Sequence, residues 1–232
     1  MSLPSVSRDY LEALLVAMVF ALFARTFTFQ AFKIPTGSME PNLLVGDHIL
    51  VNKFVFAPVA AAAERRWLPT RAIRRGDVVV FRFPEDPRRD FIKRCIGLPG
   101  DRIEIRAKAI SVNGEPLREE GYASFTDLNV YPDNPFLDES RSRRDNFGPY
   151  TVPEGHYFFL GDNRDNSNDS RVWGAVPAGY VKGRALLVYW SFAGAAEDET
   201  TPDLGGKLWR LLEVATHFVG RTRWERSFLL VR

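Results

Sequence analysis

The hydrophobic and polar positions divide the chain into a long apolar run near the N-terminus, a central region of short alternating segments, and a different C-terminal segment. Between Tyr10 and Phe32 only Glu12 and Arg25 are charged, and residues 13–24 are apolar without interruption. A helix needs about 20 mostly apolar residues to cross a bilayer. The pattern therefore predicts a membrane anchor over residues 10–32, preceded by a tail of residues 1–9.

Two other interpretations of the apolar run remain open. A buried core helix would normally have one polar face, and residues 13–24 have none. A cleaved signal peptide would need a basic front end and a small-x-small cleavage site, and neither is convincing here. An uncleaved anchor is favoured. Its orientation is not set by charge, because Arg8 precedes the run while Arg25 and Lys33 follow it.

The central region reads as strands. Short runs of apolar and β-branched residues, bounded by Gly, Pro and Asp, are typical of strands joined by turns. The predicted strands are Leu44–Phe54, Val78–Arg82, Phe91–Gly97, His156–Leu160 and Val181–Phe192. Asn113-Gly114, which follows the segment Arg102–Val112, predicts a tight hairpin turn. These elements indicate a mainly β fold.

Residues 194–232 have a different character. An acidic linker is followed by apolar residues on one helical stripe, namely Leu208, Leu211, Leu212, Ala215, Phe218 and Val219. A helix packed on the core is the favoured interpretation, and a helix lying in a membrane interface is the alternative.

Composition excludes several functions. The net charge of +2 and the absence of an arginine-rich helix give no support for nucleic-acid binding. Cys95 is the only cysteine, so an intramolecular disulfide is impossible, and no Cys/His cluster has zinc spacing. The polar segment at residues 161–174 resembles a calcium loop, but Ser170 and Val176 occupy the positions that need glycine and glutamate. We therefore expect no metal site.

Ser38 is a candidate nucleophile. Pro35, Gly37 and Pro41 around it predict a loop. Gly37 allows a substrate to approach the backbone closely and leaves the Ser38 amide free to face an oxyanion, while the hydroxyl of Thr36 offers a second donor. A serine in such a loop is, by itself, most often only a turn residue.

Lys93 is a candidate general base. On a two-residue period it shares a strand face with Phe91 and Cys95. An apolar environment favours the neutral amine, which can take a proton from a serine hydroxyl. Most lysines on a strand simply extend into solvent. In the segment 161–174, Arg164 and Arg171 are expected to pair with carboxylates, and a serine there could hold the lysine amine.

Taken together, the strings IPTGSMEPNLLVGD, RGDVVVFRFPEDPRRDFIKRCIGLPGD and GDNRDNSNDSR resemble the motifs of the bacterial type I signal peptidases, the leader peptidase family of serine proteases with a Ser/Lys dyad. The resemblance extends from about residue 31 to residue 191. It implies a membrane-anchored serine endopeptidase that cleaves signal peptides after small-x-small (Ala-x-Ala) sites through an acyl-enzyme. It implies no cofactor.

The resemblance assigns a role to individual residues. Ser38 corresponds to the nucleophile, Lys93 to the general base, and Thr36, with the Ser38 amide, to the oxyanion hole. Ser167 corresponds to the serine that orients the base. Structural support is implied for Asp162, Asp165, Asp169 and Arg171. Substrate pockets are implied for Phe32, Ile34, Met39, Leu43, Ile49, Val80, Phe91 and Ile92.

The implied architecture is an antiparallel β catalytic core with a small inserted cap and one N-terminal transmembrane helix. The core would comprise residues 33–102 and 153–193, and the cap residues 103–152. The implied location is the bacterial inner or plasma membrane, with a single pass and the catalytic domain outside the cytoplasm. Expected partners are signal peptides of secreted preproteins, the phospholipid bilayer and the nearby protein-export translocon. A self-cleaving Ser/Lys repressor and a catalytically silent membrane scaffold are the rival functions.

Overall fold

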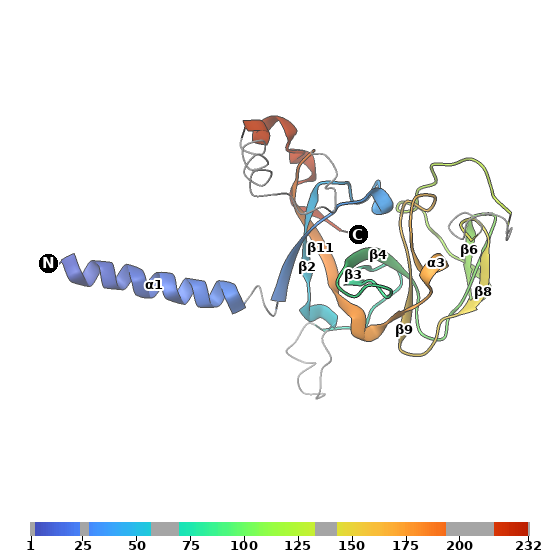
Figure 1. Ribbon diagram of the computed structural model, residues 1–232, viewed down its shortest axis with the longest axis horizontal. Helices are drawn as coiled ribbons and strands as arrows, with labels where there is room; N and C mark the ends of the chain where they lie inside the picture. The colour runs from blue at the N-terminus through green and yellow to red at the C-terminus, as the bar shows by residue number, and fades with distance from the viewer. Residues whose placement is uncertain (1–2, 24–27, 57–69, 133–142, 194–215, 232) are drawn as a thin grey trace.

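The computed structural model describes residues 3–23, 28–56, 70–132, 143–193 and 216–231. An N-terminal helix, α1 (Leu3–Phe23), projects from a body built of two antiparallel sheets (Figure 1). Short helical turns interrupt the connections: η2 (Gly37–Met39), η3 (Phe54–Phe56), α3 (Ser170–Trp173), η5 (Ala178–Tyr180) and η6 (Trp224–Arg226).

The larger sheet has eight strands. In spatial order they are β1 (Phe29–Lys33), β2 (Asp47–Asn52), β11 (Val181–Ser191), β3 (Val78–Arg82), β4 (Asp90–Gly97), β9 (His156–Leu160) and β10 (Val176–Pro177), with β12 (Leu229–Leu230) paired to β11. Each of these strand pairs is antiparallel. The prediction of a mainly β, antiparallel fold is confirmed.

The smaller sheet consists of β7 (Glu115–Pro116), β6 (Ala109–Val112), β5 (Arg102–Arg106) and β8 (Phe147–Thr151). Asn113 and Gly114 both have positive φ and connect β6 to β7, so the predicted tight turn is confirmed. A second turn was not predicted. Ala107 and Lys108 also have positive φ, and they divide residues 102–112 into two strands, β5 and β6.

Where β3 pairs with β4, the two faces of the larger sheet contribute to different apolar clusters. Val80 lies opposite Ile92, and both contribute to an apolar cluster that also contains Ile34 and Val188. Val79 lies opposite Lys93, on the face where Phe81 and Cys95 belong to another cluster. A strand alternates its side chains between faces, so Lys93 and its neighbours Ile92 and Arg94 point to opposite sides.

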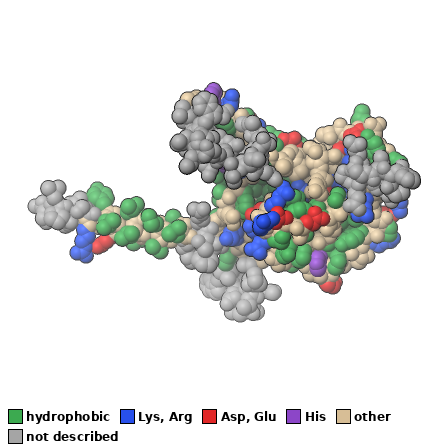
Figure 2. Space-filling view, in the orientation of Figure 1, with side chains coloured by type: hydrophobic (Ala, Val, Ile, Leu, Met, Phe, Trp, Pro, Cys, Tyr) green, Lys and Arg blue, Asp and Glu red, His purple; other side chains and the backbone are tan. Residues whose placement is uncertain are grey.

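The expected anchor over residues 10–32 is wrong for residues 29–32. The helix ends at Phe23, and Phe29–Lys33 form β1, which pairs with β2. In the described part of the chain, no helix is both long enough and apolar enough to cross a membrane. The body of α1 is covered by exposed apolar side chains, with charge confined to its N-terminal end (Figure 2).

The prediction for the C-terminal stripe lies largely outside the described residues, because Leu208, Leu211, Leu212 and Ala215 are not among them. Residues 216–221 are helical, and Phe218 and Val219 on this turn are exposed. After this turn the chain returns to the larger sheet.

Candidate active site

Ser38 and Lys93 meet beside an interior strand of the larger sheet. Ser38 lies in the turn η2, within the loop that joins β1 to β2, and Lys93 lies in the middle of β4. The Nζ atom of Lys93 is 2.6 Å from the Oγ atom of Ser38. Both residues are buried, with 7% of Ser38 and 4% of Lys93 exposed. Two residues 55 positions apart thus form one hydrogen-bonded pair.

Burial lowers the pKa of Lys93 from 10.5 to about 8, because the ammonium group is removed from water. The carboxylates of Asp169 and Asp162 oppose this effect, and Arg171 adds to it. The ring of Phe91 lies 5.5 Å from Nζ, on the same strand face. The expected apolar environment of the amine is therefore present. A fraction of the amine is neutral near pH 8, and a neutral amine can accept the hydroxyl proton of Ser38.

The loop that carries Ser38 is closed at its base by two backbone hydrogen bonds. Ile34 N donates to Asp47 O at 2.8 Å, and Gly46 N donates to Ile34 O at 3.0 Å. Asn163 holds the turn by two hydrogen bonds. Its backbone N–H donates to Ser38 O at 3.1 Å, and its side chain donates to Gly37 O at 3.2 Å. Ser38 is thereby hydrogen-bonded to the segment that follows β9.

Thr36 is an exposed, extended residue at the start of η2, and among the described residues its side chain makes no capping bond to this turn. The first amides of a helical turn lack partners within that turn. The Ser38 amide and the Thr36 hydroxyl therefore remain available to a substrate oxygen. The geometry permits an oxyanion site beside Ser38 Oγ.

Ser167 lies close to Ser38 and Gly161 but makes no defined contact with the lysine. A Cβ atom placed on Gly161 would lie 2.2 Å from Ser167 Oγ and 2.5 Å from Ser38 O, so these groups surround the glycine. Within the described part of the chain, the buried Oγ of Ser167 has no hydrogen-bond partner of good geometry. Its hydroxyl nevertheless contributes to lowering the pKa of Asp169. A bond to Lys93 is not formed in this structure.

Asp169 and Arg171 form the expected ion pair. Two nitrogens of Arg171 donate to the two oxygens of Asp169, at 2.8 and 2.7 Å. Burial alone would raise the pKa of Asp169, but the charge and hydrogen bonds of Arg171 outweigh it and lower the pKa. Asp169 also caps α3 and accepts from Gly161 N. The pair fixes the chain directly behind the dyad.

Asp162 and Asp165 have other partners than expected. Asp162 is fully buried and receives Arg94 Nε and Nη2 at 2.7 and 2.6 Å, rather than Arg164 or Arg171. Asp165 instead contacts the smaller sheet, because it accepts from Lys108 Nζ at 3.0 Å. One carboxylate thus ties the 161–171 segment to β4, and the other ties it to the β5–β6 turn.

The expected pocket residues fall into two apolar clusters. Five of them are fully buried in one cluster: Ile34, Met39, Leu43, Ile49 and Val80. Phe32 and Ile92 are half-buried and pack against this cluster. Phe91 packs in a different cluster and stacks on Phe83. Phe91 is therefore separated from the other expected pocket residues and lies beside Lys93.

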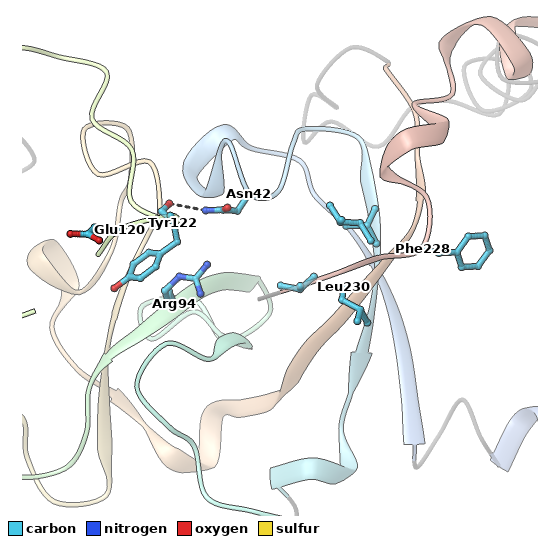
Figure 3. A pocket seen from close by; sticks show the side chains of 10 residues that line it. Asn42, Arg94, Glu120, Tyr122, Phe228 and Leu230 are labelled. Atoms are coloured by element: carbon cyan, nitrogen blue, oxygen red, sulfur yellow. Dashed lines mark hydrogen bonds between the residues drawn. The ribbon is translucent and has the colours of Figure 1, made fainter. Parts of the chain in front are cut away.

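Sequence reasoning missed Arg94 and Asn42. Asn42 Nδ2 donates to Asp162 Oδ2 at 2.9 Å and to Tyr122 O at 2.7 Å, and the ring of Tyr122 covers the Arg94 guanidinium at 4.4 Å. Asn42, Arg94 and Tyr122 line one side of a cavity of about 770 Å³ (Figure 3). The only signal in the sequence was the position of Arg94 next to Lys93, on the opposite strand face.

Comparison with known proteins gives consistent matches. The family model described as "Signal peptidase, peptidase S26" matches residues 7–190. Signal peptidase I of Pseudomonas aeruginosa is 37% identical over 206 residues, which cover 79% of this chain and 72% of that protein. Signal peptidase I of Aquifex aeolicus is 32% identical over 228 residues, covering 79% and 84%. A solved signal peptidase I from Enterococcus faecalis matches 49% of this chain and 97% of its own, with 30% identity and a TM-score of 0.37.

Proposed function

Because the chain belongs to the peptidase S26 family of signal peptidases, we propose that it removes signal peptides from exported preproteins with Ser38 as nucleophile and Lys93 as general base. The observation that carries this proposal is the 2.6 Å separation of Lys93 Nζ and Ser38 Oγ, in a buried site where the pKa of the amine is about 8. A serine hydroxyl needs such a neighbour to become nucleophilic.

The proposed reaction has two halves. Neutral Lys93 takes the hydroxyl proton while Ser38 Oγ attacks the carbonyl carbon of the residue before the scissile bond. The protonated amine then returns this proton to the departing amine nitrogen, which leaves an ester on Ser38. Lys93 next deprotonates a water molecule, which attacks the ester; the bond between the acyl carbon and Ser38 Oγ breaks, Oγ takes the proton back from Lys93, and the acid product is released. The Ser38 amide and the Thr36 hydroxyl would stabilise the oxyanion of both tetrahedral intermediates.

The packing of the expected pocket residues supports a preference for small side chains. Five of them are almost fully buried in one apolar cluster, and Phe32 and Ile92 pack against it. We place the substrate pocket over this cluster, where a large side chain at P1 would overlap the buried residues and alanine would fit. We expect peptides with Ala at P1 and P3 to be cleaved, and the same peptides with Leu at P1 to be resistant. Equal cleavage of both would contradict this pocket.

We assign membrane attachment to α1, with the catalytic domain outside the cytoplasm and close to the translocon from which preproteins emerge. The exposed apolar residues of α1, including Leu14, Val16 and Phe20, do not lie on a single stripe. A helix that is apolar all round favours burial in an apolar medium. Deletion of residues 1–23 should release the protein from membranes and leave cleavage of a soluble peptide intact. Retention of the deletion variant on membranes would contradict the assignment.

Cleavage of a purified preprotein tests the proposal as a whole. The full chain should release a signal peptide from a preprotein with an Ala-x-Ala site, while Ser38→Ala and Lys93→Ala should each be inactive. Ser111→Ala, which removes a hydroxyl from β6 in the smaller sheet, is the matched control and should retain activity. Normal cleavage by Ser38→Ala would exclude Ser38 as nucleophile. A folded wild-type protein without any cleavage would favour a silent scaffold.

A further inference from the structure

The C-terminal arm, defined as residues 222–231, lies beyond residue 190, where the match to the signal peptidase family ends. It returns to the larger sheet. Thr222 forms a bridge with Phe192, and β12 pairs with β11 through Leu187 opposite Leu230. Figure 1 shows this last stretch of chain running back into the middle of the body. The arm is thus hydrogen-bonded to the larger sheet, although several of its side chains are exposed.

Arg226 of the arm contacts the loop that carries the nucleophile. Its Nη2 atom donates to Asn42 O at 2.8 Å and to Asp47 Oδ2 at 2.7 Å, and its Nε atom lies 3.3 Å from Asp47 Oδ1. Asp47 is fully buried and also accepts from Leu44 N at 2.9 Å. One planar guanidinium therefore holds two points of the loop at once, which a lysine ammonium could not do with the same geometry.

A second arginine of the arm reinforces this contact. Arg223 Nη1 donates to Val45 O at 3.1 Å and to Ser191 Oγ at 3.2 Å, and it lies 3.9 Å from Asp47 Oδ1. Its backbone N–H donates to Ser191 O at 2.9 Å. The arm is anchored on β11, and from there it supports the loop between Asn42 and Asp47.

The opposite rim of the loop is held by a different set of groups. Asn42 donates to Asp162 and Tyr122, and the cavity of about 770 Å³ separates Tyr122 and Arg94 from Leu230 of the arm (Figure 3). Phe228 and Leu229 of the arm also line this cavity. Met39 and Leu43 pack the loop into the apolar core, and the polar contacts at its two sides hold it in addition to this packing.

We propose that the C-terminal arm positions the nucleophile, with Arg226 as its main positioning residue. This inference rests on the proposed role of Ser38. The arm does not touch the dyad; it fixes Asn42 and Asp47, and this span lies in the same closed loop as Ser38, with Leu43 N bonded to Met39 O at 2.9 Å. Since a displacement of about 1 Å can cost on the order of 10²-fold in rate, a loosened loop should impair turnover more than binding.

Steady-state cleavage of a small-x-small peptide by the full chain provides the test. Arg226→Ala should lower kcat on the order of 10²-fold and leave KM within roughly threefold. Arg226→Lys should recover part of the lost kcat, because lysine restores the positive charge but not the several N–H donors of the planar guanidinium. Amide exchange of residues 37–47 should become faster in Arg226→Ala. Glu225→Gln, an exposed neighbour on η6, is the matched control and should behave as wild type.

Arg226→Ala leaves Asp47 buried without its main partner and could therefore fail to fold. The double variant Asp47→Asn/Arg226→Met avoids the orphaned charge, so its Tm should stay close to that of wild type. Its kcat should still be low, with KM unchanged. A folded double variant with wild-type kcat would overturn the proposal, as would a loss confined to KM.

Ser38→Ala, measured in the same series, separates this inference from the proposed function. If Ser38→Ala is inactive while the folded Arg226 variants keep full kcat, only the role of the arm is refuted. If Ser38→Ala cleaves normally, the nucleophile itself is wrongly assigned, and the inference falls with it.

Discussion

The proposed role of Lys93 in the reaction has a cost in stability. A general base needs a neutral amine near neutral pH, and burial favours the neutral form by making the charged form costly. A pKa of about 8 instead of 10.5 corresponds to ~3 kcal/mol, which opposes folding whenever the amine is charged. The residue to which we assign the role of base therefore destabilises the fold.

Replacement of Lys93 by methionine should stabilise the protein while abolishing activity. Because the folded state has the lower pKa, the unfolded chain binds more protons between pH 8 and 10.5. The gain from Lys93→Met should be largest below about pH 8, at ~3 kcal/mol, and should shrink as the pH rises through this window. Denaturant unfolding of the wild type and of Lys93→Met, at neutral pH and near pH 10, measures this gain in the free energy of unfolding. A gain that grows with pH would contradict the direction of the shift.

Gly161 tolerates no side chain. A Cβ atom there would lie 2.2 Å from Ser167 Oγ and 2.5 Å from Ser38 O, and the second of these belongs to the backbone of the nucleophile turn. Gly161→Ala should therefore displace Ser38 and lower kcat by on the order of 10²-fold. Gly179→Ala, where a Cβ meets no atom within 4 Å, is the control. Equal activity of both variants would show that the turn moves freely.

The sequence predicted the local surroundings of single residues better than their partners in the fold. Phe91 and Cys95 beside Lys93 were enough to predict a lowered pKa, because alternation along one strand is a local property. The pairing of Arg94 with Asp162 joins residues 68 positions apart, and that of Arg226 with Asp47 spans 179. The pattern of neighbouring residues in the sequence cannot predict such pairs, because they depend on the order of the strands in the sheet.

At the scale of elements, buried strands were predictable and special turns were not. The prediction of His156–Leu160 matches β9 in full, and that of Val78–Arg82 matches β3. The turn at Ala107-Lys108 was missed because neither residue usually adopts positive φ. β1 was assigned to the anchor because its apolar residues continue the preceding run, and only its pairing with β2 reveals a strand. The predicted start of the next strand at Leu44 fails because a turn occupies residues 44–47.

Asp165 connects the two sheets, so its removal should reduce stability more than chemistry. Its side chain is 3% exposed and lies 3.0 Å from Lys108 Nζ and 3.6 Å from Arg144 Nε. Asp165→Ala should lower the free energy of unfolding by about 3 kcal/mol, because it leaves two cations with fewer partners in a buried site. Asp86→Ala removes an exposed pair with Arg88 and should cause no measurable change. Equal unfolding midpoints for the two variants would refute this role of Asp165.

At the scale of the whole molecule, the site is assembled from distant parts of the chain. The β1–β2 loop provides Ser38, β4 provides Lys93, the segment after β9 supports both, and the C-terminal arm holds the loop from the other side. Each part is fixed by strands of the larger sheet. This arrangement brings motifs spread over more than 130 residues to one place, and it explains why the sequence alone did not reveal the contacts of the arm.

The pH dependence of kcat/KM for peptide cleavage tests the central claim most directly, because it reports the protonation state of the base in the free enzyme. If Lys93 is the base, kcat/KM should rise with pH as the amine loses its proton, with an apparent pKa of about 8. Lys93→Ala should lose both the activity and this rising limb. Two results would contradict the Ser38–Lys93 dyad. One is a kcat/KM that stays high and constant from about pH 6 to pH 10. The other is a Lys93→Ala variant whose kcat/KM still rises with pH as in the wild type.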